Sequence, residues 1–268
     1  MDKDPYLVDD FSLKSLYLTI HANGNYLSNA TGFIVKKRDQ YFLVTNLHVI
    51  TGRDNETKKI LNSSCAIPDI ISIFHHSSVS TYGHGAWSIR KERIYNSEGN
   101  PRWLEHPRTC IKNVDMLEEP NIDIAVLPLE NAENIEIYIY DIEELSNILL
   151  PPGLSVSIIG YPFGRTSAAL YPIWKTGHIA SDIESHIEER HFLIDATTRE
   201  GMSGSPVVYR AFGSYQAKNG ATINFRGVNT YFLGIYSGRI QKDIEIGIVW
   251  RPKLINEIID LYNEQFSK

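Results

Sequence analysis

The chain has 268 residues and a formal net charge of −6, and 43% of its residues are hydrophobic while 22% are charged. This size and composition are typical of a globular chain with one large domain or two small ones, and they exclude a largely disordered protein. The acidic balance without a basic face argues against an electrostatic nucleic-acid binder, and no apolar run approaches the length of a membrane span.

The N-terminus and the cysteines bear on the compartment. Residues 1–5 (MDKDP) lack the basic and then apolar pattern of a secretion signal, so we expect a cytoplasmic protein. Cys65 and Cys110 are isolated in the sequence, which favours unpaired thiols over a disulfide. We expect no metal site, because the histidine cluster has no second ligand pair at a recognisable spacing: His75, His76 and His84.

The first half of the chain is predicted to form an antiparallel β unit. Runs of β-branched and aromatic residues, separated by turns, indicate strands at 13–21, 32–35, 41–46, 69–74 and 121–129. Between them we expect a surface loop over 51–62 and a hairpin that pairs 86–94 with 102–105. Residues 130–150 contain acidic side chains and no Lys or Arg, which favours a solvated linker.

A second set of short strands follows the linker, at 154–159, 175–181, 192–196, 206–210, 231–236 and 244–250. Short strands at turn-punctuated intervals are typical of a compact antiparallel barrel. Residues 212–226 are predicted to be a polar loop with a turn at Asn219-Gly220. From Lys253 to Phe266, apolar residues recur at three- and four-residue steps, which predicts an amphipathic helix that begins at Pro252 and packs on the outside.

A glycine-flanked serine stands between two of these strands, in the segment Gly201-Met202-Ser203-Gly204-Ser205-Pro206. Glycine permits the positive φ values of a tight loop, which can hold a serine hydroxyl exposed beside backbone N–H groups. Nucleophilic attack on a carbonyl needs this arrangement. Taken alone, so short a motif is more often a turn than an active site.

Two further residues lie at strand edges. His48 follows the strand at 41–46, and Asp123 opens the apolar run at 121–129. Taken alone, His48 suits a rim histidine bonded to a carbonyl, and Asp123 suits a turn or cap residue. The histidine and the aspartate belong to the first β unit and Ser203 to the second, so a cleft between two barrels would bring the three together.

These three segments resemble the chymotrypsin-like (trypsin-like) serine peptidases. Residues 44–49 (VTNLHV) are similar to the strand-to-histidine motif of that family, residues 121–127 (NIDIAVL) to its D-I-A segment, and residues 201–206 (GMSGSP) to its serine loop. The likeness covers roughly residues 13–250 and is closer to bacterial members of the HtrA and glutamyl-endopeptidase kind. Too few residues follow position 250 for a PDZ domain, so we expect no full HtrA architecture.

The resemblance implies an all-β fold of two antiparallel six-stranded β-barrels packed around a cleft, with a C-terminal α-helix. The N-terminal barrel would occupy residues 1–130, and the C-terminal barrel with the helix residues 131–268, together forming one peptidase domain. His48 would act as general base and then acid, Asp123 would fix its tautomer, and Ser203 would form an acyl-enzyme. The N–H groups of Gly201 and Ser203 would form the oxyanion hole, without metal or cofactor.

The sequence also departs from the family pattern, and its substrate specificity stays open. Met202 stands where secreted digestive members carry an aspartate that pairs with a newly cut amino terminus, so that route of activation is not expected. The expected substrate-binding residues are Thr197, Thr198, Tyr236, Ser237, Gly238 and Arg239. Thr197, at the expected pocket floor, is not acidic and gives no support for cleavage after Lys or Arg. Arg239 either favours an acidic side chain before the scissile bond or points into solvent.

Two classes of function compete. The first is an active serine endopeptidase acting on proteins or peptides, with an esterase on small acyl substrates as a variant of the same chemistry. The second is a latent or catalytically silent barrel pair that binds proteins. The presence of all three side chains and both loop glycines favours the enzyme. A cytoplasmic endopeptidase needs restraint, so we expect gating by a regulatory protein partner or by a disordered oxyanion loop around Arg199 to Met202, and no nucleic-acid or membrane partner.

Overall fold

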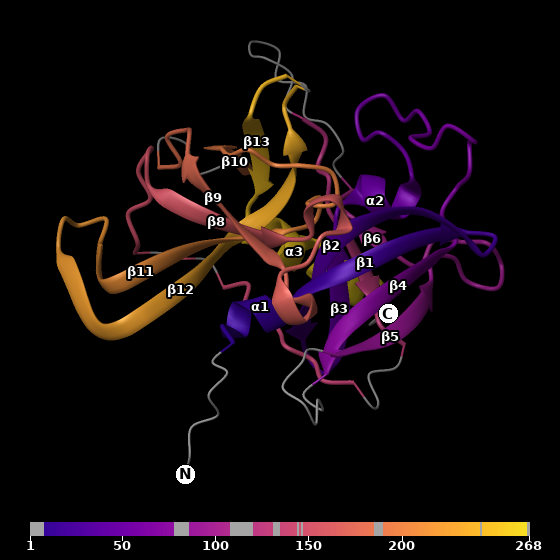
Figure 1. Cartoon of the computed structure of the whole chain (residues 1–268), viewed down its shortest axis with the longest axis horizontal. Helices are drawn as coiled ribbons and strands as arrows, with labels where there is room; N and C mark the ends of the chain where they lie inside the picture. Colours follow the sequence, from indigo (N-terminus) through magenta and orange to yellow (C-terminus); the bar gives the residue numbers. More distant parts are fainter. Residues whose placement is uncertain are drawn as a thin grey trace.

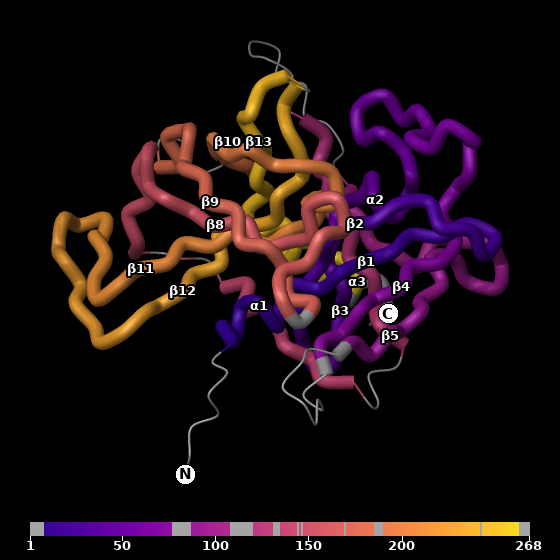
Figure 2. The backbone as a smooth tube through the Cα atoms, in the orientation of Figure 1, coloured from indigo at the N-terminus to yellow at the C-terminus, as the bar shows by residue number. Residues whose placement is uncertain are grey.

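The computed structural model describes residues 8–77, 86–107, 120–130, 135–143, 145, 147–184, 190–241 and 243–266. Two β units lie beside each other, the first formed by strands before residue 129 and the second by strands after residue 154 (Figure 1). The second unit follows the first along the chain, and the C-terminal helix lies where the two units meet (Figure 2). Within the described ranges, no helix is long and apolar enough to cross a membrane.

The first unit is an antiparallel sheet whose strand order is β5-β4-β1-β2-β3-β7-β6 among the described residues. Its strands are β1 (Ser15–Ala22), β2 (Asn25–Lys37), β3 (Gln40–Thr45), β4 (Ile70–Ser77), β5 (Ala86–Arg93), β6 (Leu104–Glu105) and β7 (Ala125–Pro128). Apolar side chains of β1, β2, β3, β4 and β7 share one core. The expected strand segments are confirmed, the one at 102–105 as the two-residue β6, so the described sheet has seven strands where the resemblance implied six.

The expected hairpin of residues 86–94 with 102–105 is wrong. Strand β5 pairs with β4, whereas β6 pairs with β7. Locally, the two segments are joined by the bridge between Tyr95 and Pro101 and by the Arg102 side chain, which donates to the Arg93 carbonyl at 2.6 Å and contacts Glu92 at 3.3 Å. The apolar side chains explain this choice: Trp87 of β5 packs edge-on to Phe74 of β4, with ring centroids 4.8 Å apart.

The second unit is a closed six-stranded barrel in the described part of the chain, with strand order β10-β13-β12-β11-β8-β9. Its strands are β8 (Ser155–Gly160), β9 (Ile173–Ile179), β10 (His191–Asp195), β11 (Pro206–Gln216), β12 (Thr222–Arg239) and β13 (Ile246–Trp250). This confirms the all-β fold and the expected barrel. The turn at Asn219-Gly220 is also present, with Gly220 at φ +83°.

The predicted polar loop over 212–226 is wrong, because β11 and β12 continue through it as one long hairpin. The hairpin extends away from the barrel as an arm (Figure 1). Phe212 is 70% exposed and Val228 43% exposed on this arm. Both faces of the arm are partly solvated there, so the sequence carries polar residues without the alternation that marks a half-buried strand.

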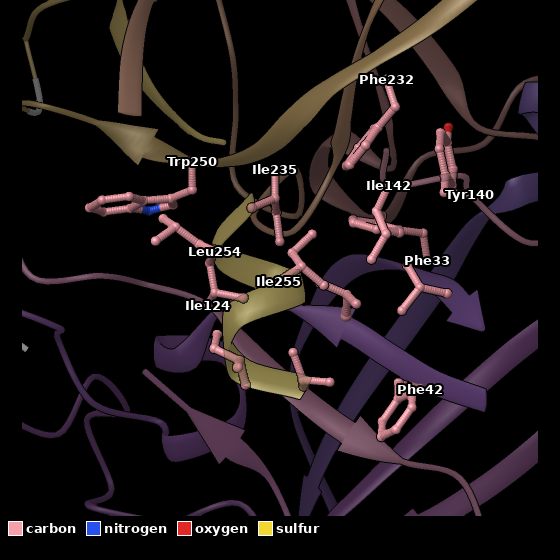
Figure 3. Packing of buried hydrophobic residues seen from close by; sticks show 14 of the residues in the cluster. Phe33, Phe42, Ile124, Tyr140, Ile142, Phe232, Ile235, Trp250, Leu254 and Ile255 are labelled. Carbon is pink, nitrogen blue, oxygen red and sulfur yellow. The ribbon is translucent and has the colours of Figure 1, made fainter. Parts of the chain in front are cut away.

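Short helices complete the chain: α1 (Asp10–Lys14), α2 (Leu47–Thr51), and the 3-10 turns η1 (Pro162–Gly164) and η2 (Ala168–Leu170). The C-terminal helix α3 (Pro252–Phe266) is confirmed at its expected bounds. It is buried more deeply than expected. Its apolar face joins one cluster with Phe33 and Ile124 of the first unit and with Ile235 of the second (Figure 3). The helix therefore ties the two β units together.

We expect Ile255→Ala to lower the free energy of unfolding by about 2–5 kcal/mol, because its fully buried side chain would leave a cavity at the junction of the two units. Urea denaturation measures the change. Leu261→Ala on the same helix is the matched control, since that side chain is 38% exposed, and it should change stability by about 0.5 kcal/mol or less. Equal effects of the two variants would contradict the described packing of α3.

Candidate active site

His48 lies in the first turn of helix α2, directly after strand β3. His48 thus follows the strand as expected, but it lies in a helix that was not expected, because the five-residue α2 starts at Leu47. Gly52 ends the helix at φ +64°, and its N–H donates to the His48 carbonyl at 3.0 Å. The His48 N–H donates to Asp123 Oδ1 at 3.0 Å, so both backbone groups of the histidine are held.

Asp123 is 4% exposed and lies two residues before strand β7. Its Oδ2 is 2.6 Å from His48 Nδ1 and accepts a hydrogen bond of 2.6 Å from the Ser237 hydroxyl. Its carbonyl accepts from the Asn46 amide at 2.7 Å. Burial raises the pKa of the Asp123 carboxyl, but the His48 charge and the hydrogen bonds from His48 and Ser237 outweigh it and lower the pKa. The carboxylate is thus charged and orients the imidazole.

Ser203 Oγ lies 3.0 Å from His48 Nε2, which completes a chain of contacts from Asp123 through His48 to Ser203. The loop that holds Ser203 requires glycine on both sides. Gly201 and Gly204 have φ values of +88° and +83°. A Cβ on Gly204 would collide with the carbonyl oxygen of Thr31. The backbone N–H of Thr31 donates to the Ser203 carbonyl at 2.9 Å. Strand β2 of the first unit therefore fixes the serine loop of the second.

The peptide groups before Ser203 are oriented by donors outside the loop. The Glu200 carbonyl accepts from the Phe163 N–H at 2.6 Å, and the Gly201 carbonyl accepts from Thr31 Oγ1 at 2.8 Å. Because a trans peptide places its N–H opposite its carbonyl, the Gly201 N–H points away from Phe163. Within the described residues the N–H groups of Gly201 and Ser203 have no acceptor, so two donors are available beside Ser203 Oγ.

The expected substrate-binding residues fall into separate roles. The buried hydroxyls of Thr198 and Tyr236 hydrogen-bond to each other, and burial raises the pKa of Tyr236 to about 12. Ser237 binds Asp123, a role that was not expected. Thr197 is exposed. Gly238 and Arg239 line a cleft with His48 and Ser203.

Arg239 is not simply directed into solvent. Its Nη1 lies 3.5 Å from Glu245 Oε1, which also contacts Arg199 Nη1 at 3.2 Å. The positive charge of Arg239 therefore already has a carboxylate partner. Such a partner weakens, without removing, the attraction that Arg239 would exert on an acidic substrate side chain.

Two hollows meet at His48 and Ser203. One, of about 1060 Å³, runs along residues 237–239 and contains Asp54 and Glu56. The other, of about 570 Å³, lies beside Glu200, Gly201 and Phe163. A chain laid across both hollows would pass the Ser203 hydroxyl and the two free N–H groups. The arrangement can perform nucleophilic attack on a carbonyl with proton transfer through His48.

No group of three or more metal-ligating side chains occurs among the residues that the structure describes. Cys65 is a free, exposed thiol, whereas Cys110 and His84 lie outside the described residues. His75 and His76 are buried on β4, and burial, with the nearby charges of Arg90 and His76, lowers the pKa of His75 to about 4. Burial also lowers the pKa of His76, so both histidines are neutral side chains packed within the sheet.

A pH measurement tests the surroundings of His48. Burial lowers the pKa of His48, but the Asp123 contact and the charge of Asp54 raise it above its ordinary value. An imidazole can accept a proton from Ser203 only when it is neutral, so any activity that uses His48 as a base rises as His48 loses its proton. We therefore expect Asp54→Asn to move the acid limb of kcat/KM to lower pH. Asp39→Asn, on an exposed turn, is the control and should leave the limb in place. A shift to higher pH would contradict this electrostatic account.

Three residues hold the serine loop or Asp123 in place, and the sequence did not predict these roles: Thr31, Phe163 and Ser237. Thr31 of β2 and Phe163 of η1 act on the serine loop through hydrogen bonds between segments far apart in the sequence, which leave no local pattern. Ser237 lies at a register shift between β12 and β13, where a bulge turns its side chain toward Asp123, and this pairing is visible only in the structure.

Comparison with known proteins places the chain in one protein family. A model of the trypsin-like peptidase domain matches residues 30–213, more than half of the chain. No curated protein matches the sequence significantly. Similar solved structures include the active form of the Rv3671c protease from M. tuberculosis, with 15% identity, a TM-score of 0.48, and coverage of 93% of this chain and 81% of that one. A serine endoprotease from Yersinia pestis has 16% identity, a TM-score of 0.48, and coverage of 96% and 67%.

Proposed function

Because this chain belongs to the trypsin-like peptidase family and is a serine endopeptidase by class, we propose that it hydrolyses peptide bonds through His48, Asp123 and Ser203. The observation that carries the proposal is the continuous contact from Asp123 Oδ2 to His48 (2.6 Å) and from His48 to Ser203 Oγ (3.0 Å). Its substrates are proteins or peptides, and the chemistry uses side chains and backbone N–H groups of the chain.

The proposed reaction has two halves. Ser203 Oγ attacks the scissile carbonyl carbon while its proton passes to His48 Nε2, and the N–H groups of Gly201 and Ser203 donate to the developing oxyanion. His48 then gives the proton to the leaving nitrogen, the C–N bond breaks, and an acyl-enzyme remains. A water attacks this ester with His48 as base, and the Ser203 hydroxyl is restored. Asp123 keeps Nδ1 protonated and stabilises the imidazolium.

We further propose that residues 1–130 and 131–268 act as the two halves of one peptidase domain. The shared cluster around α3 and the hydrogen bonds of Thr31 to the serine loop support this division. Gating by a protein partner remains a proposal as well. The loop of residues 199–202 is held by Phe163 and Thr31, which favours a partner over loop disorder as the restraint.

Hydrolysis of unfolded casein by the isolated chain tests the proposed activity. Turnover that requires Ser203 would support an endopeptidase, and robust turnover would make a gating partner unnecessary. Cleavage of small esters with no cleavage of matching amides would instead favour the esterase. A folded chain that cleaves neither casein, nor the small esters, nor the matching amides would favour the latent binding module. Peptides varied at the residue before the scissile bond define specificity, and preference for Leu or Phe there would exclude the acidic pocket.

A further inference from the structure

A third hollow, of about 320 Å³, lies in the second β unit, away from the catalytic cleft. Strand β10 separates the two: His191 and Leu193 line the cleft at His48, whereas Phe192, on the opposite face of the strand, lines the third hollow. No described residue lines both this hollow and either of the hollows that meet at His48. Its volume is that of a small ligand site, and the proposed reaction does not use it.

Most of the wall of the third hollow is apolar and lies deep in the molecule. Five of its side chains are buried members of the core clusters, and a sixth packs against them in part: Leu150, Ile183, Phe192, Phe232, Leu233 and Leu145. A wall of this kind favours a ligand that buries an apolar group against it.

Charged side chains complete the lining of the hollow. Lys218 Nζ lies 2.7 Å from Glu184 Oε2, so these two charges offset each other. Arg251 and Lys253 also line the hollow and are partly buried, and neither has a carboxylate partner among the described residues. The first turn of α3, where Lys253 stands, contains no acidic residue. Two uncompensated positive charges therefore lie beside an apolar wall, on a chain whose net charge is −6.

Arg251 is held in position and is incompletely paired. Its backbone N–H donates to the Arg190 carbonyl at 2.9 Å, and its Nη2 donates to the Ile183 carbonyl at 2.8 Å. Within the described part of the chain, no protein group accepts a hydrogen bond from its Nη1 or its Nε. A guanidinium has five N–H donors in a fixed plane, which suits it to the oxygens of a carboxylate. A carboxylate at Nη1 would thus meet a donor that the fold leaves unpaired.

We propose that the third hollow binds a carboxylate joined to an apolar group about the size of one large side chain. The carboxylate would lie at Arg251 and Lys253, and the apolar group against Phe192 and Leu233. Two sources present this chemistry: the free C-terminal residue of a peptide, which an endopeptidase also releases, and a short fatty acid. The proposal does not rest on the proposed function, because binding at this hollow needs no turnover.

Matched small ligands test the two halves of this chemistry. N-Acetyl-L-phenylalanine carries both the carboxylate and the apolar group, its amide lacks the charge, and N-acetylglycine lacks the apolar group. Ligand-observed NMR titrations of the native chain measure each dissociation constant. We expect a Kd on the order of 0.1 to 1 mM for N-acetyl-L-phenylalanine, the range of ligands of this size. Each of the other two should bind about tenfold more weakly or worse. Octanoate, titrated in the same way, represents the fatty-acid source.

Two variants place the ligand at this hollow. Lys253→Met keeps the length of the side chain and removes its charge, and we expect it to weaken N-acetyl-L-phenylalanine about three- to tenfold. Arg251→Gln should weaken it about tenfold or more. Neither change should alter the weak binding of the amide, which a general loss of structure would alter. Arg239→Met is the matched control, because it removes a cation from the catalytic cleft, and Lys91→Met removes an exposed one from β5. Both controls should bind like the native chain.

Tighter binding of N-acetyl-L-phenylalanine than of octanoate would support the peptide C-terminus as the source, and the reverse order would support the fatty acid. Equal affinities for the acid and its amide, or no saturable binding to the folded native chain, would overturn the proposal. Binding that is lost in Arg239→Met and kept in Lys253→Met would place the ligand in the catalytic cleft and would also overturn it. A chain that binds the ligand as expected but cleaves no substrate would leave this site standing without the proposed function.

Discussion

Replacing Ser203 by alanine is expected to lower kcat for casein or peptide hydrolysis on the order of 10⁶-fold, with little change in KM. The variant lacks the oxygen that attacks the carbonyl, while the N–H groups of Gly201 and Ser203 and both hollows persist. His48→Ala should lose activity to a similar extent, because Ser203 Oγ would have no base at 3.0 Å. The double variant should be no worse than either single one, since the two residues act as a unit.

Ser214→Ala, on the β11–β12 arm, is the control for removal of a hydroxyl elsewhere and should keep full activity. Each variant should unfold at nearly the native temperature, which separates lost chemistry from lost structure. Residual hydrolysis within tenfold of the native rate in purified Ser203→Ala would contradict the proposed nucleophile.

Replacing Asp123 by asparagine is expected to lower kcat on the order of 10⁴-fold at neutral pH. The carboxylate accepts from His48 Nδ1, the His48 N–H and the Ser237 hydroxyl. An amide would present donors to some of these partners, which favours the tautomer of His48 that carries its proton on Nε2. That proton faces Ser203 Oγ, so the imidazole could no longer act as its base.

Ser237→Ala provides a graded comparison, because it removes one donor to the carboxylate and leaves the charge in place. We expect a smaller loss, on the order of ten- to a hundredfold, as for a single hydrogen bond to a charged group. Steady-state kinetics of both variants, with unfolding curves for each, measure the difference. If Asp123→Asn kept more than a tenth of native activity, the orienting role of the carboxylate would be wrong.

The strands could be predicted because runs of β-branched and aromatic residues stand between turn signals. Strand β3, for example, is fully buried over four of its six residues and stands out as an apolar run. Strand pairing was harder, since pairing joins segments far apart in the sequence. Strand β5 pairs with β4, and nothing within residues 86–105 indicates that preference over a local hairpin.

At the candidate site too, local features could be predicted and long-range contacts could not. His48, Asp123 and Ser203 lie in segments whose residue types resemble a known family, so they could be picked from the sequence. The helix that carries His48 is five residues long, too short to show a 3.6-residue period. Phe163 holds the loop before Ser203 through its backbone N–H, a group that every residue except proline has. Its role depends on where the fold places it and leaves no mark in the sequence.

The most direct test of the account is labelling of the folded chain with a fluorophosphonate, which reacts with a serine only when a base activates it and donors hold the developing oxyanion. The native chain, Ser203→Ala and His48→Ala are compared at equal concentration, with circular dichroism to establish folding. The account predicts a labelled native chain and two unlabelled variants. A folded native chain that does not react, or a label that persists in Ser203→Ala, would contradict an assembled Asp123–His48–Ser203 site.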